Sequence, residues 1–160
     1  MKKFELTAEF VTNIFGKKLF RIKALVAFDN VEKGELGGFV EKEENLSQNG
    51  NAWVSGDARV YGDAWVYGDA QVSGDAWVSG NADYAVVKGF GRYFRATTFF
   101  RCRDEILRVQ CGCFYGNLTQ FREIVKKTHG DSKRAKEYLA IADLMELHFS
   151  DEEEKQEATE

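Results

Sequence analysis

Apolar and polar positions repeat with a period of six between residues 51 and 84. Each unit reads Asp or Asn, then Ala, a variable residue, Val, Ser or Tyr, and Gly. On an extended segment Ala and Val lie two positions apart and point to the same side, which we expect to be the interior. The variable residue between them points outward. The pattern therefore predicts a series of short strands, with an interior column made of Val54, Val60, Val66, Val72 and Val78.

Each strand is followed by a turn, because Gly and the Asp or Asn after it tolerate positive φ. A six-residue period is typical of a parallel β-helix, in which three strands and three turns make an 18-residue coil. Stacking at this period pairs Trp53 with Gln71, Arg59 with Trp77, and Trp65 with Asp83. The three tryptophans then lie on three different faces. A disordered low-complexity tract is the alternative, but such tracts seldom keep an apolar column in register.

The segments before the repeats predict a hairpin and a first, degenerate coil. Residues 4–15 and 18–28 have imperfectly alternating apolar positions, with a turn near Gly16 and Lys17. Residues 34–38 then turn the chain, and Val40 and Leu46 are the inward candidates of the first coil. Barely two coils of good repeats need caps at both ends, because an open end exposes unpaired strand edges.

After the repeats, the pattern predicts a small α+β module. Residues 97–102 and 106–111 form a hairpin that turns at Asp104 and Glu105. Asn117 and Gln120 have the spacing of a capping box. The first helix is expected to bury Leu118, Phe121, Ile124 and Val125, and to end at Gly130. A second helix starts at Asp131 or Ser132 and carries a stripe of Ala135, Tyr138, Leu139, Ala142 and Met145.

The repeats resemble a known family. The run of hexamers, together with the leader at residues 19–25, Gly34–Glu41 and Asn45–Ser47, is similar to hexapeptide-repeat, left-handed β-helix proteins. It most resembles small repeat proteins that bacteriophages and prophages often encode. The resemblance covers most of residues 18–84 and extends to Cys111–Phe114. It implies a left-handed coil, which nothing in the spacing shows.

Together these patterns predict a mainly β protein with a small α+β part. We expect an N-terminal β-hairpin cap at 1–33, a short left-handed parallel β-helix at 34–87 and an α+β module at 88–149, a β-hairpin plus two helices that caps the other end. Residues 150–160 read as an acidic disordered tail.

Composition and charge narrow the function classes. The chain has 160 residues, 44% of them apolar, which suits one compact domain or two small modules that share a core. The net charge of −4 hides a basic segment, because residues 84–149 carry 12 basic and 7 acidic groups. We find neither a membrane-spanning apolar stretch nor a signal peptide, and therefore expect a cytoplasmic protein with no membrane partner.

An enzymatic interpretation has little support in the repeats. Hexapeptide acyltransferases, the best-known members of the family, place a histidine base on or beside the coil. Here the histidines are His129 and His148, both at ends of the C-terminal helices. Cys102, Cys111 and Cys113 suggest zinc, but the hairpin register keeps Cys102 and Cys111 about 13 Å apart. The Asp residues of the repeats need only serve turns. We expect no catalytic residue, no metal and no cofactor.

A strip between residues 88 and 108 interleaves basic and aromatic side chains. Arginine pairs with phosphates and aromatic rings stack on bases, so the strip could bind nucleic acid or a nucleotide. A half-buried sheet with solvated arginines is the simpler interpretation, and arginines that meet the acidic repeats of another subunit are a third. The candidate anion-binding residues are Lys88, Arg92, Tyr93, Arg95, Arg101, Arg103 and Arg108.

We favour a non-catalytic protein-binding scaffold over nucleic-acid binding and over acyl transfer. Outward aromatic residues on a rigid coil are typical of contact surfaces and predict a homo-oligomer, a dimer or a trimer. The resemblance to phage-borne proteins implies a bacterial protein partner, such as a host defence protein that the chain would inhibit. The candidate contact residues are Trp53, Arg59, Tyr61, Trp65, Tyr67 and Trp77.

Overall fold

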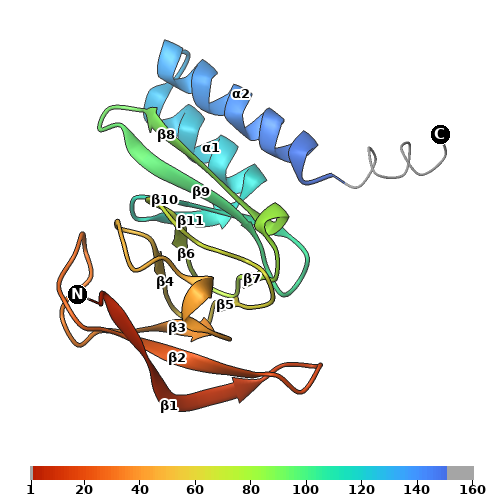
Figure 1. Ribbon diagram of the computed structural model, residues 1–160. Coiled ribbons are helices and arrows are strands. Elements are labelled where there is room, and N and C mark those ends of the chain that lie inside the picture. Colours follow the sequence, from red (N-terminus) through yellow and green to blue (C-terminus); the bar gives the residue numbers. More distant parts are fainter. Residues whose placement is uncertain (1, 151–160) are drawn as a thin grey trace.

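The computed structural model describes residues 2–150 and shows a mainly β protein with two helices. Figure 1 shows four successive layers: the N-terminal strands, the short strands of the repeats, a four-stranded sheet and the helices. The predicted acidic tail lies outside the described residues, apart from Ser150.

The N-terminal hairpin is confirmed, with shorter strands than predicted. β1 (Phe4–Thr12) and β2 (Lys18–Ala24) pair antiparallel. Between them, the Asn13 side-chain oxygen accepts hydrogen bonds from the backbone amides of Phe15 and Lys17, at 2.9 and 3.0 Å. β2 pairs antiparallel with β3 (Leu36–Val40), and β3 pairs parallel with the first strand of one repeat wall. The hairpin therefore continues a wall of the coil as a mixed sheet. Its order is β1-β2-β3-β5-β7, in which β5 is Arg59–Val60 and β7 is Trp77–Val78.

The repeats form short parallel strands with the predicted offset. β4 (Trp53–Val54) pairs with β6 (Gln71–Val72), and β5 (Arg59–Val60) with β7 (Trp77–Val78), each 18 residues apart. Glycines at the corners, such as Gly56 and Gly74, have φ of +62°. The inward positions are almost fully buried, and they are Ala52, Val54, Ala58, Val60, Ala64, Val66, Ala70, Val72, Ala76 and Val78. The interior column that the sequence predicts is thus confirmed.

A buried asparagine completes the first coil. Asn45, in the 3-10 helix η1 (Glu43–Asn45), donates hydrogen bonds from its amide to the carbonyls of Gly62 at 3.2 Å and Ala64 at 2.8 Å. It accepts one from the Lys42 amide at 2.9 Å. These bonds satisfy a polar group that would otherwise be costly to bury. Val40 and the adjacent Leu46 are buried, as predicted.

The C-terminal module is an antiparallel sheet with both faces covered. After the 3-10 helix η2 (Asn81–Asp83), it comprises β8 (Tyr84–Phe90), β9 (Arg95–Arg101), β10 (Leu107–Cys111) and β11 (Phe114–Asn117), ordered β11-β10-β9-β8. Side chains alternate along β9, so Phe100 packs with the repeat core and Phe99 with the helices. The pattern of residues 114–117 did not predict the strand β11.

The register of the β9–β10 hairpin differs by one residue from the prediction. Leu107 pairs with Arg101 rather than facing Cys102. Cys102 instead forms an isolated antiparallel bridge with Ala76 of the repeats. The tertiary contact with the coil therefore takes Cys102 out of the hairpin, which a local pattern could not indicate.

The helices begin where their caps predict. α1 (Leu118–His129) has the Asn117–Gln120 capping box, with both hydrogen bonds at 2.9 Å, and α2 (Lys133–His148) starts after Ser132. Phe121 and Val125 are buried as expected, whereas Ile124 is exposed. On α2, Leu139 is only half-buried and Ile141 takes its place in the buried stripe. Leu118, also expected to be buried, is only half-buried. The expected stripes were therefore correct except at Leu118, Ile124 and Leu139.

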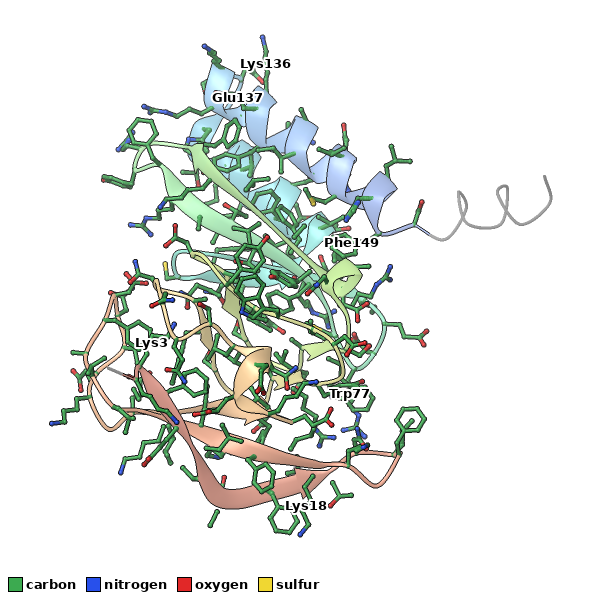
Figure 2. All side chains as sticks on the ribbon, viewed as in Figure 1. Lys3, Lys18, Trp77, Lys136, Glu137 and Phe149 are labelled. Carbon is green, nitrogen blue, oxygen red and sulfur yellow. The ribbon has the colours of Figure 1, made fainter. Side chains whose placement is uncertain are left out.

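A lysine is buried where the hairpin meets the coil (Figure 2). The Lys3 ammonium donates hydrogen bonds to the carbonyls of Ala52 at 2.7 Å and Gly50 at 3.4 Å, and it lies 4.8 Å from the centre of the Phe28 ring. Among the described residues, no carboxylate lies within salt-bridge distance of it. Burial lowers the pKa of Lys3 from its ordinary value of 10.5 to about 8.

We expect the contribution of Lys3 to stability to rise between about pH 8 and pH 10.5. Below this window both states hold the proton and folding buries a charge. Within it the unfolded state binds more protons than the folded state, so increasing pH favours folding. The measurement is urea denaturation of the wild type and Lys3→Met at pH 7.5 and pH 10. Groups common to both proteins cancel in the difference, and a difference that does not change with pH would contradict the prediction.

Candidate functional site

Trp53 is not a surface residue, which corrects the sequence prediction. Its side chain is 2% exposed, and the Phe28 ring meets it edge-on at 5.4 Å between centroids. Trp53 occupies an outward position of the repeat, but the N-terminal segment covers this face of the coil. The indole nitrogen is buried without a hydrogen-bond partner among the described residues. Trp53 therefore belongs to the core and contributes to no contact surface.

Three of the predicted contact residues gather beside the tip of the β1–β2 hairpin. Arg59 lies over the Trp77 ring at 5.4 Å, and Arg103 lies near the same ring at 5.7 Å. The hairpin tip adds two highly exposed apolar side chains, Ile14 at 81% and Phe15 at 76%. We call this the hairpin-tip face, which consists of Ile14, Phe15, Arg59, Tyr61 and Trp77.

The other predicted contact residues lie on a different side of the coil. The rings of Trp65 and Tyr67 stack at 4.4 Å with an interplanar angle of 20°, and they are 47% and 51% exposed. They border a hollow of about 440 Å³ whose wall includes Tyr84. The Tyr84 hydroxyl donates a hydrogen bond of 2.6 Å to the Trp65 carbonyl, and burial raises the pKa of Tyr84 to about 12. The aromatic residues thus form two separate patches.

Four cations of the 88–108 strip are already engaged by other side chains. Lys88 pairs with Asp69 at 2.5 Å, and Arg108 pairs with Asp104 at 2.7 Å. Arg101 pairs with Asp83 at 3.2 Å and also donates a hydrogen bond to the Phe149 carbonyl at 3.3 Å. The Arg103 guanidinium lies over the Trp77 ring. The predicted strip is therefore not one continuous surface, because neighbouring strand residues point to opposite faces.

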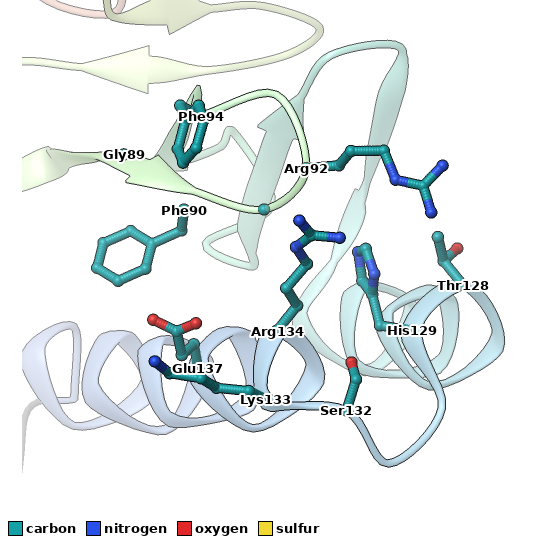
Figure 3. Close-up of a pocket in the computed structure, with 11 residues that line it drawn as sticks. Gly89, Phe90, Arg92, Phe94, Thr128, His129, Ser132, Lys133, Arg134 and Glu137 are labelled. Carbon is teal, nitrogen blue, oxygen red and sulfur yellow. The ribbon is translucent and has the colours of Figure 1, made fainter.

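Arg92, a fifth cation of the strip, lies in a cleft that the sequence pattern did not predict. The β8–β9 turn and the α1–α2 turn enclose a space of about 620 Å³. Figure 3 shows the side chains of Arg92, His129 and Arg134 reaching into this space. We call it the basic cleft, and its polar lining consists of Arg92, Thr128, His129, Ser132, Lys133, Arg134 and Glu137. The sequence contained one signal for this cleft, which is the pair of basic residues Lys133 and Arg134 shortly after the turn at Gly130.

The remaining strip residues flank this cleft. Tyr93 and Phe94 form the exposed tip of the β8–β9 turn, and Phe94 has a positive φ of 56°. The Arg95 guanidinium lies 5.2 Å from the centre of the Tyr93 ring. Both Tyr93 and Arg95 line a second hollow of about 380 Å³, which shares Arg92 and His129 with the basic cleft. The two hollows thus meet around the turn.

The cysteines line neither the hairpin-tip face nor the basic cleft. Cys102 is buried with its sulfur 4.0 Å from the Tyr115 hydroxyl, and burial raises the pKa of its thiol to about 11. Cys111 accepts a hydrogen bond from the Thr97 hydroxyl at 3.2 Å, and Cys113 is exposed. Within residues 2–150, no three His, Cys, Asp or Glu side chains are grouped so that they could hold a metal ion.

Comparison with known proteins supports the repeat architecture. A family model described as YdcK beta solenoid repeat matches residues 50–68. Together with the 18-residue parallel pairing, this match identifies a β-solenoid repeat. None of the curated proteins matches the chain. In the described part of the chain, no helix has the length and apolar character needed to cross a membrane.

Proposed function

We propose that this chain is a cytoplasmic, non-catalytic scaffold that binds a bacterial protein through the hairpin-tip face. The family resemblance supports a left-handed hexapeptide coil and a bacteriophage or prophage origin. A phage protein of this kind would act on its host, so we further propose that binding inhibits a host defence protein.

The observation that carries this proposal is the composition of the hairpin-tip face. Trp, Tyr and Arg are the residue types that dominate binding energy at protein interfaces, and Arg59, Tyr61 and Trp77 supply all three. The exposed Ile14 and Phe15 add an apolar anchor beside them. Arg59 and Arg103 have no carboxylate partner among residues 2–150, so they suit a partner with acidic side chains around an apolar pocket.

The positions of the histidines favour binding over acyl transfer. His129 lines the basic cleft and His148 is exposed at the end of α2, both in the helical layer beyond the four-stranded sheet. An acyltransferase of this family would need its base on or beside the coil.

We also propose that the chain forms a homo-oligomer, a dimer or a trimer. The exposed Trp65–Tyr67 stack supports this, because contiguous aromatic surface usually marks a contact. Its position on a different side of the coil leaves the hairpin-tip face available to a partner.

The binding proposal predicts that Phe15→Ser weakens partner binding by about 30-fold or more, as loss of an interface hot spot does. The experiment is affinity capture from bacterial lysate with the wild type and Phe15→Ser, followed by titration of the purified partner. Light scattering on the same protein gives its oligomeric state. Phe15 is highly exposed, so its replacement should not change the melting temperature.

Leu144→Ser is the matched control, because Leu144 is an exposed apolar residue on α2, far from the hairpin. This variant should bind like the wild type. Failure to retain a stoichiometric protein, or equal retention by Phe15→Ser, would contradict the proposed function.

A further inference from the structure

The basic cleft lies at the opposite end of the molecule from the hairpin-tip face. Figure 2 places Glu137, which lines the cleft, at the helical end, and Lys18 at the hairpin end. A partner held at the hairpin would leave the cleft accessible. A ligand of the cleft can therefore bind independently of a protein partner at the hairpin-tip face.

The cations of the cleft have not been neutralised by the fold. Among residues 2–150, no carboxylate oxygen lies within 4.0 Å of a side-chain nitrogen of Arg92, Lys133 or Arg134. Elsewhere in the same module, Arg101, Arg108 and Arg122 all have carboxylate partners at 2.7–3.3 Å. The cleft thus holds three cations without a carboxylate partner within 4.0 Å, beside one carboxylate side chain, Glu137, in the same lining.

The ring pair at the edge of the cleft points to a ligand with aromatic groups. Tyr93 and Phe94 are consecutive, 68% and 64% exposed, and immediately follow Arg92. Two adjacent exposed rings beside a cleft offer a contiguous surface for contact with a ligand. Aromatic side chains beside a basic groove are the combination that binds unpaired bases and their phosphates.

We propose that the basic cleft and the tip of the β8–β9 turn bind single-stranded nucleic acid. Arg92, Lys133 and Arg134 contact phosphates, and Tyr93 and Phe94 stack on bases. The second hollow, on the Tyr93 and Arg95 side of the turn, continues the path of the strand around the turn.

Three features favour a single strand over other anions. A duplex keeps its bases stacked inside, so it offers no free base face to the exposed rings. A lone phosphate or mononucleotide would occupy the cleft without using both the rings and the second hollow. The repeats carry exposed acidic corners such as Asp57, Asp63 and Asp75, which repel a polyanion and confine it to the helical end.

The test is fluorescence anisotropy of the full chain with labelled oligothymidylate and oligouridylate of about 20 nucleotides. Three phosphate contacts predict that log K falls with log[salt] with a slope of about −2 between about 50 and 200 mM salt. Unlabelled duplex, mononucleotide and inorganic phosphate serve as competitors. All three should compete at least tenfold more weakly than the single strand.

Two variants separate the roles of charge and stacking. Arg92→Gln with Arg134→Gln should weaken binding about tenfold or more and make the slope shallower, from about −2 to about −0.7, because one phosphate contact remains. Tyr93→Leu with Phe94→Leu keeps apolar volume but removes both rings, and should weaken binding at least fivefold without changing the slope. Arg122→Gln is the control, because Arg122 is paired with Asp143 and Glu146 on the helices and should bind like the wild type.

Several outcomes would overturn the inference. The first is no binding of the oligonucleotides at about 50 mM salt, and the second is unchanged affinity of both double variants. The third is a loss of affinity in Arg122→Gln equal to that of the double variants. The fourth is competition by duplex as strong as competition by the single strand. Competition by mononucleotide or phosphate at the strength of the oligonucleotide would show a small-anion site instead. None of these results depends on protein capture at the hairpin-tip face, so the two proposals can fail separately.

Discussion

Replacing Trp53 with alanine is expected to lower the free energy of unfolding by about 3–5 kcal/mol. Trp53 is among the largest fully buried side chains and contacts the Phe28 ring where the N-terminal segment covers the coil. The substitution leaves a cavity in the region where these two parts pack. Urea denaturation followed by circular dichroism measures the loss, which corresponds to a decrease of roughly 10 °C or more in melting temperature.

Trp65→Ala is the matched control for this prediction, because Trp65 occupies the same position of its repeat. Since Trp65 belongs to the proposed oligomer contact, all variants are compared at a protein concentration at which light scattering shows monomers. Its side chain is 47% exposed, so we expect a loss below about 1 kcal/mol. Trp53→Phe should fall between the two variants, since it keeps a ring and removes the unpartnered indole N–H. Equal losses for Trp53→Ala and Trp65→Ala would show that the N-terminal segment around Phe28 does not bury this face.

The second large effect is expected for Gly38→Ala, with a loss of roughly 3 kcal/mol. Gly38 lies in β3, where the hairpin sheet joins the repeat wall. A Cβ atom there would lie 2.6 Å from the Ala58 carbonyl oxygen and 2.8 Å from Val54 Cγ1. Both neighbours are fixed, one as backbone and the other as a fully buried core side chain, so β3 would have to move away from the wall.

Gly80→Ala is the control for this substitution. A Cβ atom at Gly80 meets nothing within 4 Å, and the φ of −153° suits any residue. We expect no loss, or a gain of a few tenths of a kcal/mol from reduced freedom of the unfolded chain. The measurement is the midpoint of urea denaturation of both variants. The midpoints report stability when the free energy of unfolding falls with urea concentration at the same slope in both proteins. A stable Gly38→Ala protein would mean that β3 does not pack closely on the wall.

Local chemistry was sufficient to predict several elements of the fold. The Asn117–Gln120 capping box and the interior column of valines were both predicted from spacing alone and are confirmed. These features depend on neighbours within one turn or one repeat, so the sequence contains everything that they require. The division of the chain into an N-terminal cap, repeats and a C-terminal module stays a prediction.

The composition of the candidate sites depends on tertiary contacts, which the spacing of residues along the sequence does not reveal. The strip at 88–108 was a candidate anion-binding surface, with a half-buried sheet as the simpler interpretation. The sheet directs its residues to different partners, such as Asp69 for Lys88 and Asp83 for Arg101. The basic cleft instead brings Arg92 next to Arg134, which is 42 positions later in the chain. Its composition follows from packing of the helices on the β8–β11 sheet.

The sequence by itself determined that residues 51–84 coil with Ala and Val inside, because a strict six-residue period leaves the same positions inward in every repeat. Only the tertiary structure decided which outward residues are exposed. Trp53 and Trp65 have the same place in the repeat, yet the N-terminal segment that carries Phe28 covers the first, whereas the second is 47% exposed. A repeat fixes the direction of a side chain relative to its own backbone, whereas burial depends on what the rest of the chain packs against it.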